Sequence, residues 1–124
     1  MQKTIVLADD EEDILKFVRV RLAKRNYHVV VGTNGQEALE LVEKHKPDLV
    51  ILDVKMPLIT GIEVCRRLKR DEALKTIPVI LITANSLELT PEVFKVSLAD
   101  DHLFKPFEAA ALLEKVAHFI GLAA

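Results

Sequence analysis

The sequence predicts an α/β fold in which a parallel sheet is covered by helices on both faces. Five short apolar segments alternate with five segments of helical character along the 124 residues. The apolar segments are nearly continuous and rich in β-branched residues, as in strands that are buried on both faces. They cover residues 4–8, 28–31, 49–52, 79–83 and, more weakly, 103–104.

The helices follow from two kinds of signal. Apolar residues at helical spacing predict helices over 12–25, 36–45, 62–70 and 108–120. Thr90 followed by Pro91 predicts a further short helix over Pro91–Ser97, because a capping residue precedes a proline at the first helical position. Strands that alternate with helices form right-handed βαβ units. We therefore predict a (βα)5 doubly wound five-stranded parallel sheet with the flavodoxin-like strand order 2-1-3-4-5.

Length and composition indicate a single domain over residues 1–124. The 17 basic and 19 acidic residues give a formal net charge of −2, which argues against a general nucleic-acid or membrane binder. One cysteine, Cys65, excludes an intrachain disulfide and a cysteine-based zinc cluster. The longest uncharged stretch, residues 76–87, is too short to span a bilayer. We expect a soluble, cytoplasmic domain.

Polar side chains follow the central strands of the predicted sheet. Asp9 and Asp10 follow the first strand, Asp53 the third, Thr83 ends the fourth and Lys105 follows the fifth. In a doubly wound sheet the ligand site lies beyond the carboxyl ends of the strands. The sequence therefore predicts that these five side chains meet at one mouth.

The acidic run after the first strand has two interpretations. Acids before a helix often complement the helix dipole, and Asp10 with Asp13 fits a capping pattern. Asp53 favours the other interpretation, because carboxylates that converge at a buried mouth repel one another unless a cation such as Mg²⁺ joins them. A nucleotide site is disfavoured, because the turn at 8–11 lacks the small residues that bind phosphate through backbone N–H groups.

Four segments around these residues resemble the receiver domain of bacterial two-component response regulators, in particular single-domain regulators of the chemotaxis type. The resemblance runs from about residue 3 to residue 120 and rests on VLADDEEDI, LVILDVKMPLITGIEV, ILITAN and ADDHLFKPF. It implies that Asp53 is the phosphoacceptor. It also implies a Mg²⁺ site, with Mn²⁺ as the alternative metal, formed by Asp10, Asp53 and the backbone carbonyl of Lys55, and by Asp9 through a water molecule.

The resemblance also implies a signalling switch. Thr83 and Lys105 would hold the phosphoryl oxygens, and the bond between Lys105 and Pro106 would be cis. The phosphoryl group would come from a sensor histidine kinase or a histidine phosphotransfer protein, and the domain would catalyse only its own phosphorylation and dephosphorylation. Thr83 and His102 would then change the surface of the last two helices and the last strand, which contacts a downstream protein target or output domain.

Several positions depart from the usual receiver pattern. His102 stands where Tyr or Phe is common, and adds a pH dependence that a phenol lacks. Thr60 replaces a frequent acid or amide. Leu98 replaces a common glycine, at a cost of roughly 1 kcal/mol if its φ is positive. Lys55 and Asn85 resemble positions that tune phosphoryl lifetime.

Other features keep their alternatives. The helix 108–120 is apolar over more than one stripe, with Ala110, Leu113, Ala117 and Ile120 expected to face the sheet. The additional apolar surface indicates either a homodimer through the last two helices and the last strand or a wider contact within the domain.

A phosphorylation-independent pseudo-receiver is the alternative function. A haloacid-dehalogenase-type phosphatase is disfavoured, because position 55 is Lys rather than a second Asp. Cys65 is interpreted as a core residue.

Overall fold

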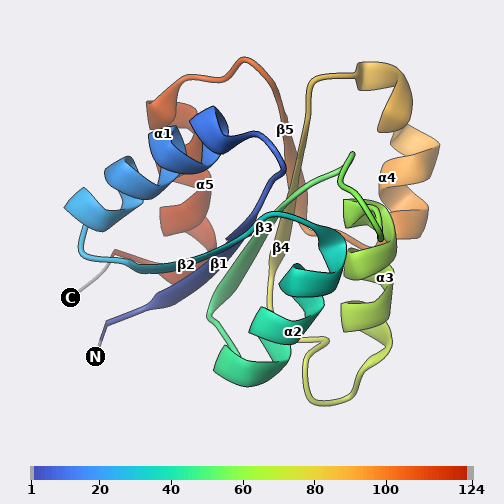
Figure 1. Ribbon diagram of the computed structural model, residues 1–124, viewed down its shortest axis with the longest axis horizontal. Helices are drawn as coiled ribbons and strands as arrows, with labels where there is room; N and C mark the ends of the chain where they lie inside the picture. The colour runs from blue at the N-terminus through green and yellow to red at the C-terminus, as the bar shows by residue number, and fades with distance from the viewer. Residues whose placement is uncertain (1, 123–124) are drawn as a thin grey trace.

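Five parallel strands form one sheet between two layers of helices in the computed structural model, which describes residues 2–122 (Figure 1). The strand order is β2-β1-β3-β4-β5, which confirms the predicted topology. The strands are β1 (Thr4–Ala8), β2 (His28–Gly32), β3 (Leu49–Asp53), β4 (Val79–Thr83) and β5 (Asp101–Phe104). The helices are α1 (Glu12–Lys24), α2 (Gly35–His45), α3 (Gly61–Arg70), α4 (Pro91–Ser97) and α5 (Ala109–Ile120), with the short 3-10 helix η1 (Ser86–Glu88) after β4.

Each face of the sheet has its own hydrophobic core. Helices α1 and α5 cover one face, and α2, α3 and α4 cover the other (Figure 1). Every residue of β3 and β4 is buried, because these strands lie inside the sheet and are covered on both sides. No helix within residues 2–122 is long and apolar enough to cross a membrane.

Two sequence predictions are corrected by the structure. Strand β5 begins at Asp101 rather than at 103, because Asp101 and His102 pair with Ile80 and Leu81 of β4 despite their polarity. In α5 the fully buried residues are Leu112 and Val116, whereas the stripe predicted to face the sheet is exposed or only partly buried. A helix that is apolar on several sides does not reveal its buried face through periodicity alone.

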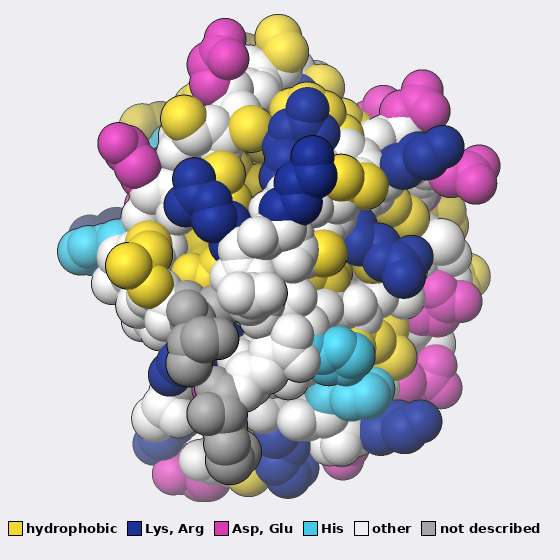
Figure 2. Space-filling view, turned by 90° about the vertical axis from the view of Figure 1, so that its left-hand side faces the viewer, with side chains coloured by type: hydrophobic (Ala, Val, Ile, Leu, Met, Phe, Trp, Pro, Cys, Tyr) yellow, Lys and Arg dark blue, Asp and Glu magenta, His cyan; other side chains and the backbone are white. Residues whose placement is uncertain are grey.

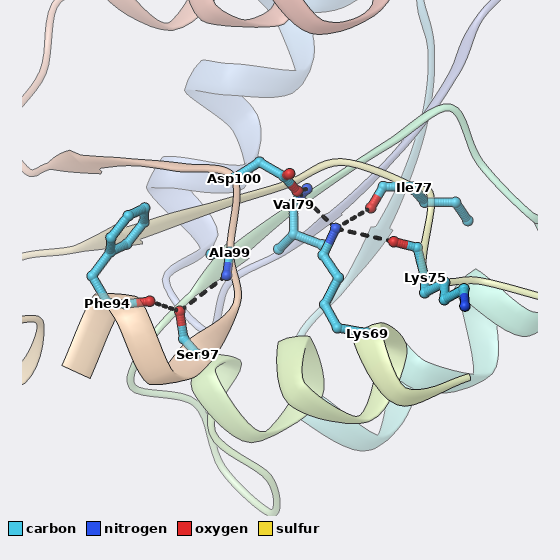
Figure 3. A network of polar contacts seen from close by, with 8 residues as sticks. All are labelled: Lys69, Lys75, Ile77, Val79, Phe94, Ser97, Ala99 and Asp100. Atoms are coloured by element: carbon cyan, nitrogen blue, oxygen red, sulfur yellow. Dashed lines mark hydrogen bonds and ion pairs between the residues drawn. The ribbon is translucent and has the colours of Figure 1, made fainter. Parts of the chain in front are cut away.

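A polar network anchors the ends of α3 and α4 to the sheet (Figure 3). The Lys69 ammonium group donates to the carbonyl oxygen of Ile77 at 2.9 Å and to the Asp100 carboxylate at 2.8 Å. Asp100 also accepts the backbone N–H of Val79 at 2.8 Å. Beside it, the Ser97 hydroxyl donates to the Phe94 carbonyl and accepts the N–H of Ala99 at 3.1 Å. No local sequence pattern predicts this network, because its members are separated by up to 31 positions along the chain.

Leu98 ends α4 in the left-handed conformation, with φ at +67°. This confirms the positive φ that the glycine-like position suggested, and it strains a residue with a branched side chain. We expect Leu98→Gly to raise the free energy of unfolding by about 1 kcal/mol, because glycine adopts this conformation without strain. Leu98→Ala is the control, since it removes most of the side chain but keeps the strain. Urea unfolding that shows equal effects of both substitutions would contradict the strain argument.

Cys65 is a core residue, as the sequence indicated. It lies on α3, is fully buried, and packs in the cluster beneath α2, α3 and α4. Burial raises the pKa of its thiol to about 12, so almost no thiolate forms at pH 8. We expect a thiol reagent to leave Cys65 unmodified in the native protein at pH 8 and to label it fully in urea. Labelling of the native protein at the rate of a free thiol would contradict this.

Candidate functional site

Three carboxylates meet at the carboxyl end of the sheet. Asp53 ends β3, and Asp9 and Asp10 follow β1, the strand directly beside β3. Carboxylate oxygens of the three residues lie within 4.8 Å of one another. Asp9 is fully buried and Asp53 is 4% exposed, whereas Asp10 lies at the surface. The cluster therefore has a buried floor and one ligand group that faces the solvent.

Lys105 is the cation of this site. It follows β5, and its side chain is 8% exposed. Its ammonium nitrogen lies 2.9 Å from Asp9 Oδ2, 2.6 Å from Glu11 Oε1 and 3.5 Å from Asp53 Oδ1. The peptide bond that joins Lys105 to Pro106 is cis. The Lys105 ammonium thus contacts three carboxylates, and with Asp10 beside them the acids at the mouth outnumber the two lysines, Lys55 and Lys105.

The pKa values report this excess of negative charge. Burial and the nearby charge of Asp9 together raise the pKa of Asp53 to about 7, against the opposing effect of Lys105. Burial also raises the pKa of Asp9, although the N–H of Glu11 donates to its carboxylate at 2.8 Å. Burial alone would lower the pKa of Lys105, but its contacts with Glu11 and Asp9 outweigh burial and raise it. A bound divalent cation would relieve the repulsion between the carboxylates.

A cavity of about 290 Å³ opens above the carboxylates. Thr83 ends β4 at this cavity, and its hydroxyl oxygen accepts the backbone N–H of Asn85 at 3.1 Å. The lining combines carboxylates, one hydroxyl, two ammonium groups and one amide, and consists of Asp10, Glu11, Asp53, Lys55, Thr83, Ala84, Asn85, Glu88 and Lys105. Such a lining suits a small anion that arrives together with a metal ion.

A larger hollow lies between α1 and the edge strand β2. Its volume is about 820 Å³, and Figure 2 shows this side of the molecule, where Lys and Arg side chains lie among apolar ones. Its wall mixes aliphatic and charged side chains and consists of Asp10, Glu12, Leu15, Lys16, Arg19, Val20, Ala23, Val31 and Thr33. Of the three clustered carboxylates only Asp10 reaches this hollow, and Lys105 does not line it. We therefore place the chemistry in the smaller cavity.

The strand order brings together the five side chains that the sequence predicted to meet at one mouth. His102 lies on β5, outside the residues that line the acidic cavity, and packs against Phe94 of α4. Glu11 is the residue that sequence reasoning passed over, because it forms the 2.6 Å contact with Lys105. The sequence signal that could have identified Glu11 was its position. It follows Asp10 directly and lies at the same edge of the sheet as the carboxylates that contact Lys105.

Comparisons with known proteins agree with this geometry. The family model of the response regulator receiver domain matches residues 5–117. The chain belongs to the response regulator receiver family. It is 31% identical to the polar-differentiation response regulator DivK of Brucella anthropi over 121 residues, covering 98% of each chain.

Two further relatives show the same receiver domain in other settings. The chain is 37% identical to the alkaline phosphatase synthesis transcriptional regulatory protein PhoP of Bacillus subtilis, over 86% of this chain but only 44% of that protein. The solved receiver domain of the sensor histidine kinase PA1611 from Pseudomonas aeruginosa is 26% identical, with a TM-score of 0.88 over 98% of this chain and 99% of that one. That structure has a magnesium ion coordinated in its active-site cleft.

Proposed function

We propose that this receiver domain is a phosphorylation switch, in which Asp53 accepts a phosphoryl group in a Mg²⁺-dependent reaction. The observation that carries the proposal is the meeting of three carboxylates with a buried lysine in one small cavity. Asp10, Asp53 and the backbone carbonyl of Lys55 would hold the metal directly, with Asp9 acting through a water molecule. When bound, Mg²⁺ supplies positive charge to the phosphoryl oxygens.

Each protein group has a definable part in the transfer. The Asp53 carboxylate attacks phosphorus in line with the departing imidazole nitrogen of a phosphohistidine, so an O–P bond forms as the N–P bond breaks. Lys105 neutralises charge on the transferred group, since its ammonium already lies 3.5 Å from Asp53. Thr83 offers a hydroxyl at the cavity wall to a phosphoryl oxygen. Water later hydrolyses the mixed anhydride and returns Asp53 to a carboxylate.

The proposal extends to partners. The donor is a sensor histidine kinase or a histidine phosphotransfer protein, and the domain catalyses only its own phosphorylation and dephosphorylation, in the cytoplasm. The output surface comprises α4, β5 and α5, where the side chains of Val96, Leu98 and Phe104 are 60%, 52% and 40% exposed. Thr83 and His102 relay the phosphorylated state to it. A downstream protein target, an output domain or a second copy of the chain docks there.

Intact mass after incubation with acetyl phosphate and Mg²⁺ tests the proposal. We expect one added phosphoryl group that requires Mg²⁺, disappears with EDTA, and is absent from Asp53→Asn. Asp13→Asn is the matched control, because it changes an exposed aspartate of α1 outside the carboxylate cluster. An adduct that persists in Asp53→Asn would refute Asp53 as the acceptor.

A second measurement separates the alternatives if no adduct forms. Magnesium titration followed by addition of beryllofluoride distinguishes a short-lived phosphoryl group from a phosphorylation-independent module. A beryllofluoride complex that forms on the wild type and not on Asp53→Asn supports the switch. Magnesium binding without any beryllofluoride complex supports the pseudo-receiver.

A further inference from the structure

His102 occupies an aromatic stack that joins β5 to α4. Its ring centroid lies 4.9 Å from that of Phe94 on α4 and 5.1 Å from that of Phe104 on β5. Phe94 itself packs at the edge of the core beneath α2, α3 and α4. The imidazole is therefore the part of β5 that contacts the middle of α4.

One nitrogen of this imidazole has no hydrogen-bond partner. Nδ1 of His102 is buried, and no atom of residues 2–122 donates to it or accepts from it. A neutral imidazole carries a single N–H, which can reside on Nε2 and leave Nδ1 without a proton. In the charged form both nitrogens are donors, and Nδ1 would then be a buried N–H without an acceptor.

Among residues 2–122 no side chain offers an acceptor to Nδ1, and Asp101 attracts a charged imidazole only through space, without a hydrogen bond to the ring. Asp101 precedes His102 on β5, so its side chain points to the opposite face of the sheet, where it binds Lys115 of α5 at 2.8 Å. The register neighbour on β4 is the apolar Leu81. On α4 the charged residues are Glu92 and Lys95, both exposed and without a contact to the imidazole.

The C-terminal end of α4 is tied to the sheet and to α3 through the residues that follow it. We therefore expect a change at His102 to displace the rest of the helix. Ser97 bridges the carbonyl of Phe94 and the N–H of Ala99, and the neighbouring Asp100 is held by Lys69 (Figure 3). At its N-terminus, α4 is capped by the Thr90 hydroxyl, which accepts the N–H of Val93 at 3.2 Å; this bond lies within the helix and does not tie it to the sheet. Between these ends, the stack with His102 is the aromatic contact of α4 with the edge strand.

We propose that His102 is a proton-sensitive latch: its protonation drives the ring out of the stack and loosens α4 from β5. Histidine is the side chain that ordinarily changes charge between pH 5 and 8, so the latch acts over the range that a cell can experience. The face formed by α4, β5 and α5 then depends on pH as well as on any covalent modification. This inference does not require that Asp53 be phosphorylated.

Nuclear magnetic resonance of the full chain between pH 5 and 8 tests the latch. We expect the ring protons of Phe94 and Phe104 and the amides of Val93 to Ser97 to shift with the same midpoint as the His102 ring. In His102→Phe, which keeps an apolar ring in the stack, these pH-dependent shifts should disappear. In His118→Gln they should persist, because His118 lies on α5 against Phe119 and away from α4.

Two results would overturn the latch. One is a His102 ring that keeps its short proton–proton contacts to Phe94 when it is charged. The other is a His102 ring that stays neutral down to pH 5. Because neither readout involves phosphate or Mg²⁺, both results are independent of the fate of the phosphorylation proposal.

Discussion

Gly61→Ala is expected to lower the free energy of unfolding by about 3 kcal/mol or more, the upper range for overpacking a closed site. Gly61 begins α3, where its N–H donates to the carbonyl of Val54 at 2.9 Å. A Cβ atom at this position would lie 2.1 Å from the carbonyl oxygen of Asp53 and 3.1 Å from Cα of Val54. Both are backbone atoms, one of them in the proposed phosphoacceptor itself, so the clash is relieved only by moving the backbone of Asp53 or that of α3.

Gly32→Ala is the matched control for this substitution. Its Cβ would lie 3.2 Å from the end of the Leu41 side chain, which can rotate away, and 3.3 Å from Cβ of Glu37, which a shift of a few tenths of an ångström relieves. We expect a loss of less than about 1 kcal/mol. Urea unfolding of both variants measures the difference. Equal losses of unfolding free energy would show that the close packing of α3 against the backbone of Asp53 is not the reason why position 61 requires glycine.

Lys105→Met is expected to destabilise the metal-free protein by about 3 kcal/mol, since removing one partner of a buried ion pair leaves an uncompensated buried charge. The carboxylates of Asp9, Glu11 and Asp53 would lose the ammonium that lies within 3.5 Å of each. Mg²⁺ should restore much of the lost stability, because it supplies positive charge to the same carboxylates.

Lys115→Met is the control for the loss of a lysine. Its ion pair with Asp101 is about 28% exposed on both sides, and surface pairs contribute less than about 1 kcal/mol. Urea unfolding at pH 7.5 with EDTA, and again with Mg²⁺, measures both variants. A Lys105→Met protein that matches Lys115→Met in EDTA would mean that the carboxylate cluster does not depend on its lysine.

Both predictions concern residues that the sequence placed correctly without revealing their surroundings. Lys105 was expected at the mouth because it follows the fifth strand, but its contact with Glu11 depends on how the start of α1 turns over the strand ends. Gly61 directly precedes the helix that the sequence predicted over 62–70, but its approach to Asp53 follows from the fold of the loop between β3 and α3. The alternation of strands and helices is a property of the hydrophobic pattern, and the strand order followed from the commonest arrangement of such units, whereas side-chain contacts depend on loop paths.

The output side of the domain was harder to predict. Asp101 and His102 lie on a short edge strand with one partner, so they are neither apolar nor regularly alternating, and the strand was placed too late in the chain. The aromatic stack of His102 and the Lys69 network unite residues from different helices and loops. No local pattern signals such contacts.

The sequence by itself determined the alternation of five strands and helices, the sheet order and the set of polar residues at the strand ends. It could do so because β-branched runs and helical spacing are local, and because parallel strands deliver their carboxyl ends to one edge. Only the tertiary structure decided which face of α5 is buried, that Nδ1 of His102 lies without a partner, and that burial and the nearby charge of Asp9 together raise the pKa of Asp53 to about 7. Burial and electrostatic coupling depend on distances between segments far apart in the chain, and those distances exist only once the layers have packed.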